Sequence, residues 1–198
     1  MIQYFLQKKI IKFIYSLLAV LFLFMPFVEA SEYIRGVNSY SYVPINASNN
    51  ARGHNNMGNI YFKEENYVAA LKEYEIAYNL EPYGKYGAVY LYNIARCFMI
   101  SNKYKEAKKA IQGCIKKDYM NITYYNALAD IIALEKNSQN EIKKYLQDKT
   151  NPYNRVLVGL IYIKTNKIKQ ARTILDEFVA NNPNLIMTED IKTILKNI

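Results

Sequence analysis

The residue types that usually carry catalysis or hold metals are scarce in this sequence. Its 198 residues include one histidine, His54, and two cysteines, Cys97 and Cys114. His54 has no cysteine or carboxylate partner in a recognisable motif, and the two cysteines are not spaced as a metal-binding or redox pair. The sequence also has no phosphate-binding loop, dinucleotide fingerprint or serine elbow. We therefore expect a non-enzymatic protein with no catalytic residue, no cofactor and no metal.

The first 30 residues have the three parts of a secretory signal peptide. The charged start contains Lys8, Lys9 and Lys12. Residues 13–28 are then an uncharged, mostly apolar run, and Val28 and Ala30 put small residues at the two positions that a signal peptidase reads. We therefore expect a signal peptide over residues 1–30, cleavage after Ala30, and a periplasmic or secreted protein.

The same segment could instead stay uncleaved as an inner-membrane anchor. The 16 residues from 13 to 28, as a helix, span about 24 Å, which is less than a hydrocarbon core of about 30 Å. Adding Ile10 and Ile11, with Lys12 reaching towards the lipid head groups, would lengthen the run. A membrane tether through residues 10–28 is therefore the alternative to secretion.

The composition changes twice after the apolar run. Residues 31–50 contain four Ser, four Asn and three Tyr, which predicts a flexible leader. From residue 51 onwards the apolar residues have helical spacing. The whole chain is 51% hydrophobic with a formal charge of +9, so a single domain with a real core is expected over residues 51–198. The positive charge would favour anionic partners. An excess of lysine can also arise from the general composition of a protein, without any functional role.

Internal repetition organises this domain. Residues 56–61 align with residues 93–98, and each block is followed at the same offset by an alanine, Ala70 or Ala107. The small residue of these blocks recurs at Gly58, Ala95, Ala129 and Gly159. Such a spacing of 30 to 37 residues is typical of stacked helical hairpins, in which a small residue lets two helices cross closely.

Residues 51–183 resemble the tetratricopeptide repeat family, whose pattern is W-x2-L-G-x2-Y, then A-x3-F, then P. The first repeat has His54 in the Trp position, followed by Met57, Gly58, Tyr61, Ala70, Tyr74, Ala77 and Pro82. The second repeat keeps Leu91, Ile94, Ala95, Phe98, Ala107 and Ile111. The third keeps only Tyr125, Leu128, Ala129 and Ile132, and has Glu141 in place of the later alanine. The fourth keeps Gly159, Tyr162, Ala171, Leu175 and Pro183.

The resemblance implies an all-α, right-handed α-solenoid of about four antiparallel helix hairpins with a C-terminal capping helix. The expected helices are 52–63, 67–80, 87–101, 104–117, 122–136, 139–149, 153–165, 168–181 and 188–196. In this register Cys97 and Cys114 lie on different helices, more than a turn apart, which disfavours a disulfide but leaves their state open.

The resemblance also implies a binding face, because in this family the first helices of the repeats line a concave groove that receives a peptide. On that face we expect Arg52, Asn55, Asn56, Asn59, Tyr92, Asn93, Arg96, Asn126 and Asp130, together with Val89 and Thr123. An asparagine amide both donates and accepts, so it can bind a peptide backbone of any sequence. Asn59 and Asn93 match the asparagines of the family's dicarboxylate clamp, but the cations of that clamp are missing, so recognition of chaperone tails is not expected.

Two further features of the pattern each allow two interpretations. The fourth first helix has an apolar inner face with Val156, Leu157 and Leu160, which the capping helix covers or which forms a hydrophobic end of the groove. The second helix over residues 104–117 carries Lys105, Lys108, Lys109 and Lys116 on one face. That face is either simply solvated or a dock for an anionic membrane or polymer.

The function expected from the sequence is therefore an exported scaffold or adaptor that binds a peptide segment of another protein. The alternative is a membrane-tethered structural protein whose basic outer face lies on an anionic surface. Nucleic acid is not an expected partner, since most of the 20 Tyr and 8 Phe residues fall at core positions of the repeats rather than on an exposed stacking surface. The sequence does not indicate an oligomeric state.

Overall fold

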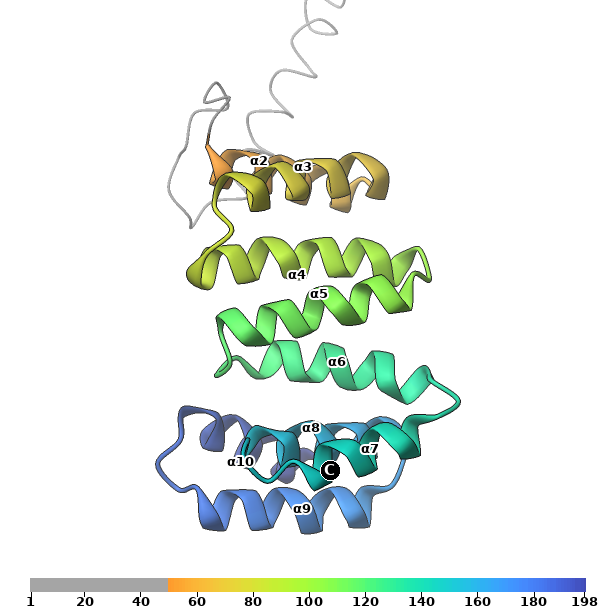
Figure 1. Ribbon diagram of the computed structural model, residues 1–198, viewed down its shortest axis with the longest axis vertical. Helices are drawn as coiled ribbons and strands as arrows, with labels where there is room; N and C mark the ends of the chain where they lie inside the picture. The colour runs from red at the N-terminus through yellow and green to blue at the C-terminus, as the bar shows by residue number, and fades with distance from the viewer. Residues whose placement is uncertain (1–49) are drawn as a thin grey trace, which may run out of the picture. The chain divides into compact units, whose positions relative to one another are not determined.

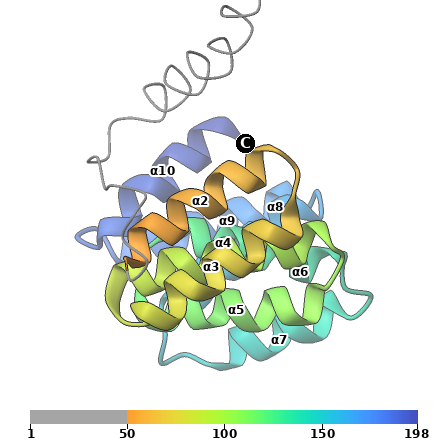
Figure 2. The same cartoon turned by 90° about the horizontal axis from the view of Figure 1, so that it is seen from above.

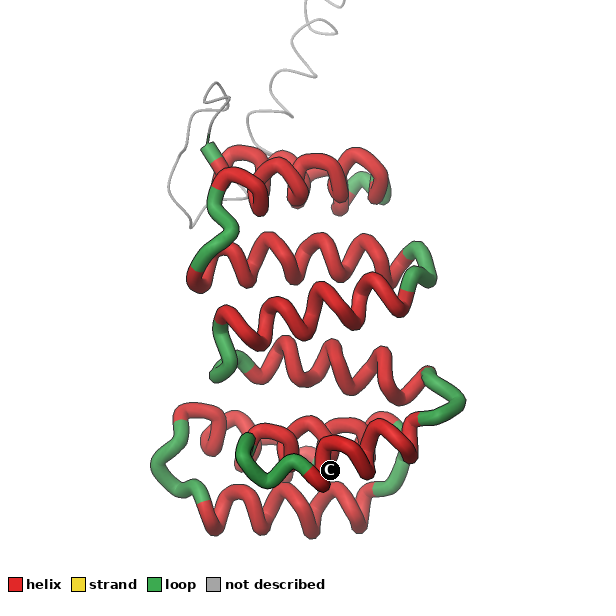
Figure 3. Tube along the Cα trace, in the orientation of Figure 1, coloured by secondary structure: helices red, strands yellow, loops and turns green. Residues whose placement is uncertain are grey.

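The structure is a computed structural model that describes residues 50–198, and every regular element in this range is an α-helix (Figures 1 and 3). The helices are α2 (Ala51–Lys63), α3 (Tyr67–Leu80), α4 (Gly84–Ile100), α5 (Tyr104–Lys117), α6 (Ile122–Leu134), α7 (Ser138–Gln147), α8 (Tyr153–Lys164), α9 (Ile168–Asn181) and α10 (Ile186–Asn197). The predicted all-α stack of helix hairpins is confirmed. The predicted signal peptide and residues 31–49 of the predicted leader lie outside the described residues. None of the helices in the described part is long and apolar enough to cross a membrane.

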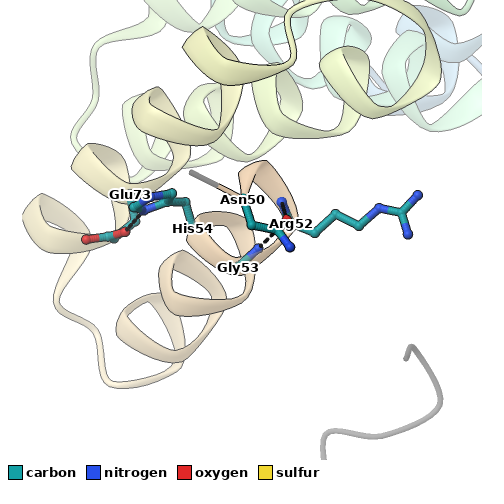
Figure 4. Close-up of polar contacts among 5 residues, drawn as sticks. All are labelled: Asn50, Arg52, Gly53, His54 and Glu73. Atoms are coloured by element: carbon teal, nitrogen blue, oxygen red, sulfur yellow. Dashed lines mark hydrogen bonds and ion pairs between the residues drawn. The ribbon is translucent and has the colours of Figure 1, made fainter. Parts of the chain in front are cut away.

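Asparagines begin several of the helices. The Asn50 side chain accepts hydrogen bonds from the backbone N–H groups of Arg52 and Gly53, at 2.9 and 3.4 Å (Figure 4). Asn66 caps α3 and Asn121 caps α6 in the same manner. A short side-chain acceptor at this position satisfies backbone donors that have no partner inside the helix. The many asparagines of the sequence therefore have structural as well as surface roles.

Three of the hairpin turns have the same geometry. After α2, α4 and α8 the chain passes through one residue with a positive φ of 57–59°, namely Glu65, Asn102 or Asn166. The next N–H group then donates back to the carbonyl of Tyr61, Phe98 or Tyr162, at 2.8–2.9 Å. This left-handed helix ending satisfies the last carbonyls and reverses the chain. The three carbonyls belong to the aromatic position of the predicted repeat, so the repeat register is correct at all three turns.

Close helix crossings confirm the role of the small residues. A Cβ atom added to Gly58 would lie 2.5 Å from the Tyr74 ring of α3, and one added to Gly159 would clash with Leu175 of α9. Ala70, Ala107 and Ala171 at the start of the second helices are fully buried. Small side chains therefore set the spacing within the regular hairpins, because larger ones would push the helices apart.

The third hairpin departs from the prediction of an ordinary antiparallel pair. α6 packs mainly against α8 and only lightly against α7. α7 buries a single residue, Ile142. The reason is chemical: Glu141 occupies the position of the missing alanine, and its carboxylate pairs with Lys108 instead of packing against α6. The stack therefore continues from α6 directly to α8.

The C-terminal helix belongs to the main core. Met187 and Ile191 of α10 are fully buried in the same core as Val156, Leu157 and Leu160 of α8. α10 packs on α9, and the view of Figure 2 places it on the opposite side from α5 and α7. The apolar residues of α8 are buried, and α8 packs mainly on α6 and α9. The alternative of an open hydrophobic end of the groove is therefore wrong.

Candidate functional site

The residues expected to bind a partner lie on three first helices. α2 carries Arg52, Asn55, Asn56 and Asn59, α4 carries Tyr92, Asn93 and Arg96, and α6 carries Asn126 and Asp130. We call this set the first-helix face. Arg52, Asn56 and Asn126 are exposed, whereas the others are half-buried except for Asn93. The set therefore divides into side chains open to a partner and side chains engaged within the fold.

Asn93 links α2 to α4 and does not project towards solvent. Only 6% of Asn93 is exposed. Its Nδ2 donates to Oδ1 of Asn55 at 2.8 Å, and its Oδ1 accepts from Nη1 of Arg96 at 3.2 Å. Both ends of this amide are thus occupied. The expectation that Asn93 would read a partner's backbone is corrected by its burial: it positions Asn55 and Arg96 instead.

Asn59 also has an internal role. Its Oδ1 accepts the hydroxyl hydrogen of Tyr74 at 2.9 Å. Tyr74 is fully buried, and burial raises the pKa of its hydroxyl to about 12. A buried hydroxyl without an acceptor costs about 1–3 kcal/mol. Asn59 is therefore needed for the stability of the first hairpin, whatever else its half-buried side chain does.

The two arginines of this face are held by aromatic rings across the same pair of helices. The Arg52 guanidinium on α2 lies 4.4 Å from the ring centre of Tyr86 on α4, and Arg96 on α4 lies 4.0 Å from that of Phe62 on α2. Cations over ring faces are attracted by the ring quadrupole. Neither arginine forms an ion pair with a carboxylate within residues 50–198. Two positive charges are therefore fixed on this face without neutralisation by a direct partner.

The part of the first-helix face that lies on α6 has no arginine, and its charged residue is already paired within the fold. Asp130 pairs with Lys164 of α8 at 2.7 Å, a contact that the sequence pattern did not indicate. Tyr92 packs against Tyr124 with ring centres 5.4 Å apart. Asn126 stays exposed. The two arginines without a carboxylate partner, Arg52 and Arg96, and the exposed amide of Asn56 therefore lie on α2 and α4.

His54 has a partner that sequence reasoning missed. Its Nδ1 lies 2.7 Å from Oε2 of Glu73 on α3, and Figure 4 shows the pair apart from the extended Arg52 side chain. The two residues are 19 positions apart, so only the tertiary register of the hairpin brings them together. No group of three or more His, Cys, Asp or Glu residues in the described part of the chain could hold a metal ion. The pair ties α2 to α3.

Both cysteines are buried free thiols. Burial raises the pKa of Cys97 to about 11 and that of Cys114 to about 12. The Cys114 thiol donates to the backbone carbonyl of Ala88 at 3.3 Å. Thiols with a raised pKa are protonated at neutral pH and are poor nucleophiles. The two cysteines are packing residues of α4 and α5.

The lysine row of α5 is not a uniform solvated face. Lys108 pairs with Glu135 at 2.9 Å and with Glu141 at 3.3 Å, and only 19% of its side chain is exposed. Lys105, Lys109 and Lys116 are exposed. Lys108 therefore connects α5 to α7 and cannot be counted as part of a basic docking surface.

The described fold agrees with comparisons to known families. Residues 88–118, which include most of α4 and all of α5, match a tetratricopeptide repeat family model, and residues 155–185 around α8 and α9 match another. The stack of hairpins and these two matches support the tetratricopeptide repeat family that the sequence pattern predicts.

Similarity to individual proteins is distant. One similar solved structure is the crystal structure of YrrB, a TPR protein with an unusual peptide-binding site. It is 16% identical, the match covers 74% of this chain and 76% of that one, and the TM-score is 0.45. No curated protein sequence matches this chain.

Proposed function

We propose that this chain is an exported, non-enzymatic scaffold or adaptor, and that a peptide segment of a partner protein binds across its first-helix face. Tetratricopeptide-type repeats support a protein-binding role, because stacked hairpins present an extended surface made from successive first helices. Both thiols are buried, and the one histidine is paired with Glu73.

The observation that carries the proposal is the cationic and amide-rich surface over α2 and α4. Arg52 and Arg96 are held by aromatic rings, and Asn55 is held by Asn93. Such fixed side chains lose little conformational entropy on binding. An extended segment with acidic character could pair with the guanidinium groups and bond its backbone to Asn56.

The test is a titration with a captured partner. Asn56→Ala combined with Asn126→Ala should weaken binding about tenfold or more, since each lost hydrogen bond contributes roughly 0.5–1.5 kcal/mol. Both side chains are exposed, so the fold should be unaffected. Asn59→Ala and Asn93→Ala are unsuitable, because they would leave the Tyr74 hydroxyl and the Arg96 guanidinium without their acceptors.

The matched control is Lys105→Ala combined with Lys109→Ala, which removes two exposed cations from α5. This variant should bind the partner as tightly as the unmodified chain. If it loses the partner while the asparagine variant keeps it, the first-helix face is not the binding surface. Lys108 is left intact in the control because it pairs with Glu135 at the end of α6 and with Glu141 of α7.

Export is the second part of the proposal and is supported by the sequence of residues 1–30. Mass spectrometry of the protein from its native cell should give Ser31 as the first residue. A chain that keeps Met1 and stays in the membrane fraction would instead support the alternative, a membrane-tethered structural protein. For that alternative the exposed Lys105, Lys109 and Lys116 supply a basic surface, and the same α5 control variant would then lose its attachment to anionic vesicles.

A further inference from the structure

A row of exposed aromatic and aliphatic side chains lies at the start of α4. The helix starts at Gly84 rather than at residue 87, and this added turn places Tyr86 and Val89 three residues apart on one face. Tyr86 is 48% exposed and Val89 is 39% exposed, and Tyr83, directly before the helix, is 81% exposed. Large apolar side chains that gather in the open commonly mark an interaction site.

This row adjoins the cationic part of the first-helix face. The Arg52 guanidinium lies over the Tyr86 ring, and Figure 4 shows the Arg52 side chain extended away from the His54–Glu73 pair. Further along α4, Tyr92 and Arg96 continue from Val89 at helical spacing. An apolar contact surface therefore lies between two fixed guanidinium groups.

The net charge of the α4–α5 hairpin as a whole favours an anionic partner. Residues 82–118, which form α4 and α5, contain eight Lys or Arg and two Asp or Glu residues, a net charge of +6, whereas residues 51–81 have a net charge of −2. Most of the excess positive charge of the protein is thus in this hairpin. Such a concentration speeds encounter with acidic segments and disfavours basic ones.

We propose that Arg52, Tyr86 and Val89 form the anchor point for the bound segment, and that this segment carries an acidic residue next to a large apolar one. The inference rests on the proposed function and specifies its partner. The apolar side chain would cover Val89 and the open part of Tyr86, and the carboxylate would pair with Arg52 in a bidentate manner. The Tyr86 ring orients the Arg52 guanidinium before the partner binds. An aromatic ring that the partner covers, next to an arginine, is a common composition for the residues that dominate the binding energy of an interface.

The experiment uses short random peptides displayed on phage and selected on the full chain. Enriched sequences should contain Asp or Glu within a few positions of Leu, Ile or Phe. Synthetic copies should bind about tenfold more weakly to Arg52→Gln and to Tyr86→Ala, as measured by fluorescence anisotropy. Raising the salt should weaken binding to the unmodified chain more than binding to Arg52→Gln, because the lost pair is electrostatic.

Matched controls are Lys105→Gln, which removes an exposed cation from α5, and Val68→Ala, which removes an exposed aliphatic side chain from α3. Both should change the affinity less than twofold. Circular dichroism should show the same helix content in all four variants, since each substituted side chain is on the surface.

Three results would overturn the anchor. They are a selection that enriches nothing, one that enriches neutral or basic peptides, and peptides that bind Arg52→Gln and Tyr86→Ala as tightly as the unmodified chain. If such peptides still lose affinity for the Asn56→Ala, Asn126→Ala variant, the first-helix face binds peptides and only the anchor is wrong. If neither set of variants affects them, the proposed function fails as well.

Discussion

The regular hairpins and the third hairpin solve the same packing problem in different ways. In α2–α3, α4–α5 and α8–α9 the same left-handed turn reverses the chain, and a fully buried alanine begins the packed face of the second helix. In α6–α7 the turn is different, because α6 ends at Glu135 in an extended conformation. α7 has ten residues and buries only Ile142. One altered repeat is thus inserted among regular ones without breaking the stack.

The difference shows which contacts are essential to a solenoid. α6 stays deeply buried because α5 and α8 cover it, so the core continues although α7 contributes little. α7 is held to its neighbours by Ile142 and by the pair of Lys108 with Glu141, and Lys108 also pairs with Glu135 at the end of α6. Partly exposed ion pairs stabilise far less than a packed apolar face. A first helix is therefore indispensable in this stack, whereas a second helix can be attached loosely.

The largest effect is expected where the regular hairpins are tightest. Gly58→Leu should lower the free energy of unfolding by about 3 kcal/mol or more, because a Cβ at this position would already lie 2.5 Å from the rigid, buried ring of Tyr74. Urea denaturation measures the loss. Gly53→Ala in the same helix is the control, since its Cβ would meet nothing closer than 3.8 Å. Gly53→Ala should cost nothing, because alanine has the higher helix propensity. Equal losses in both variants would show that the close crossing at Gly58 does not set the cost.

A difference in local stability between α6 and α7 is the next expected effect. Amide hydrogen exchange should protect α6 with the core and release α7 through a local opening that costs about 2 kcal/mol less. The third repeat keeps the fewest residues of the family pattern, and the structure assigns the resulting weakness to α7 alone. Protection of α7 equal to that of α6 would contradict the expected difference in stability between these two helices.

The polar attachment of α7 gives a smaller, pH-dependent effect. Burial opposes the charge on Lys108, but its hydrogen bonds to the carboxylates of Glu135 and Glu141 outweigh this effect, and the pKa of Lys108 is raised above its usual 10.5. A group whose pKa is raised by folding stabilises the fold fully below its unfolded pKa and loses that contribution as the pH rises through the folded value. Lys108→Met should therefore cost about 1 kcal/mol at pH 7.

The same stability difference should shrink above a pH of about 10.5. Parallel denaturation of the two proteins across alkaline pH separates this effect from the buried tyrosines, which are present in both. Burial raises the pKa of Tyr74 to about 12, so ionisation of this residue in the unfolded chain destabilises both proteins alike. A difference that is constant with pH would mean that the lysine stem, and not its charge, holds α7.

Spacing and residue type in the sequence were enough to predict most of the fold. The repeat register, the close crossings at Gly58 and Gly159 and the weak third repeat follow from small residues at fixed intervals, which act locally. The start of α4 was missed because Gly84 and Gly87 follow Pro82 and suggest a loop, although Gly84 merely begins the helix with a φ of +63°.

The site was harder to predict because its side chains depend on the rotation of one hairpin against the next. Asn93 and Asn56 are the same residue type on first helices, yet one is bonded between α2 and α4 and the other is exposed. The contacts of Lys108 with Glu141 of α7 and of His54 with Glu73 likewise join positions that no local pattern relates. Residue type predicted which hydrogen-bonding and charged groups the first-helix face would contain. Packing between the hairpins decided which of these groups stay exposed to a partner.

The smallest expected effect comes from the turns that the regular hairpins share. Asn102 and Asn166 occupy the left-handed position after α4 and α8, whereas Glu65 occupies it after α2, with a φ of 59°. Glutamate has no short polar side chain to favour this conformation, and a left-handed residue other than glycine costs about 1–2 kcal/mol. Glu65→Asn should therefore stabilise the protein by about 0.5 kcal/mol and Glu65→Gly by up to about 1 kcal/mol. Thermal denaturation detects such a change as a rise of a few degrees in Tm.

Two substitutions serve as controls. The reverse substitution, Asn102→Glu, should lower Tm by a similar amount. Asn137→Gly lies before α7, where the turn is not left-handed, and it should not raise Tm. A stabilisation by Asn137→Gly equal to that of Glu65→Gly would mean that the shared turn does not distinguish the regular hairpins from the third.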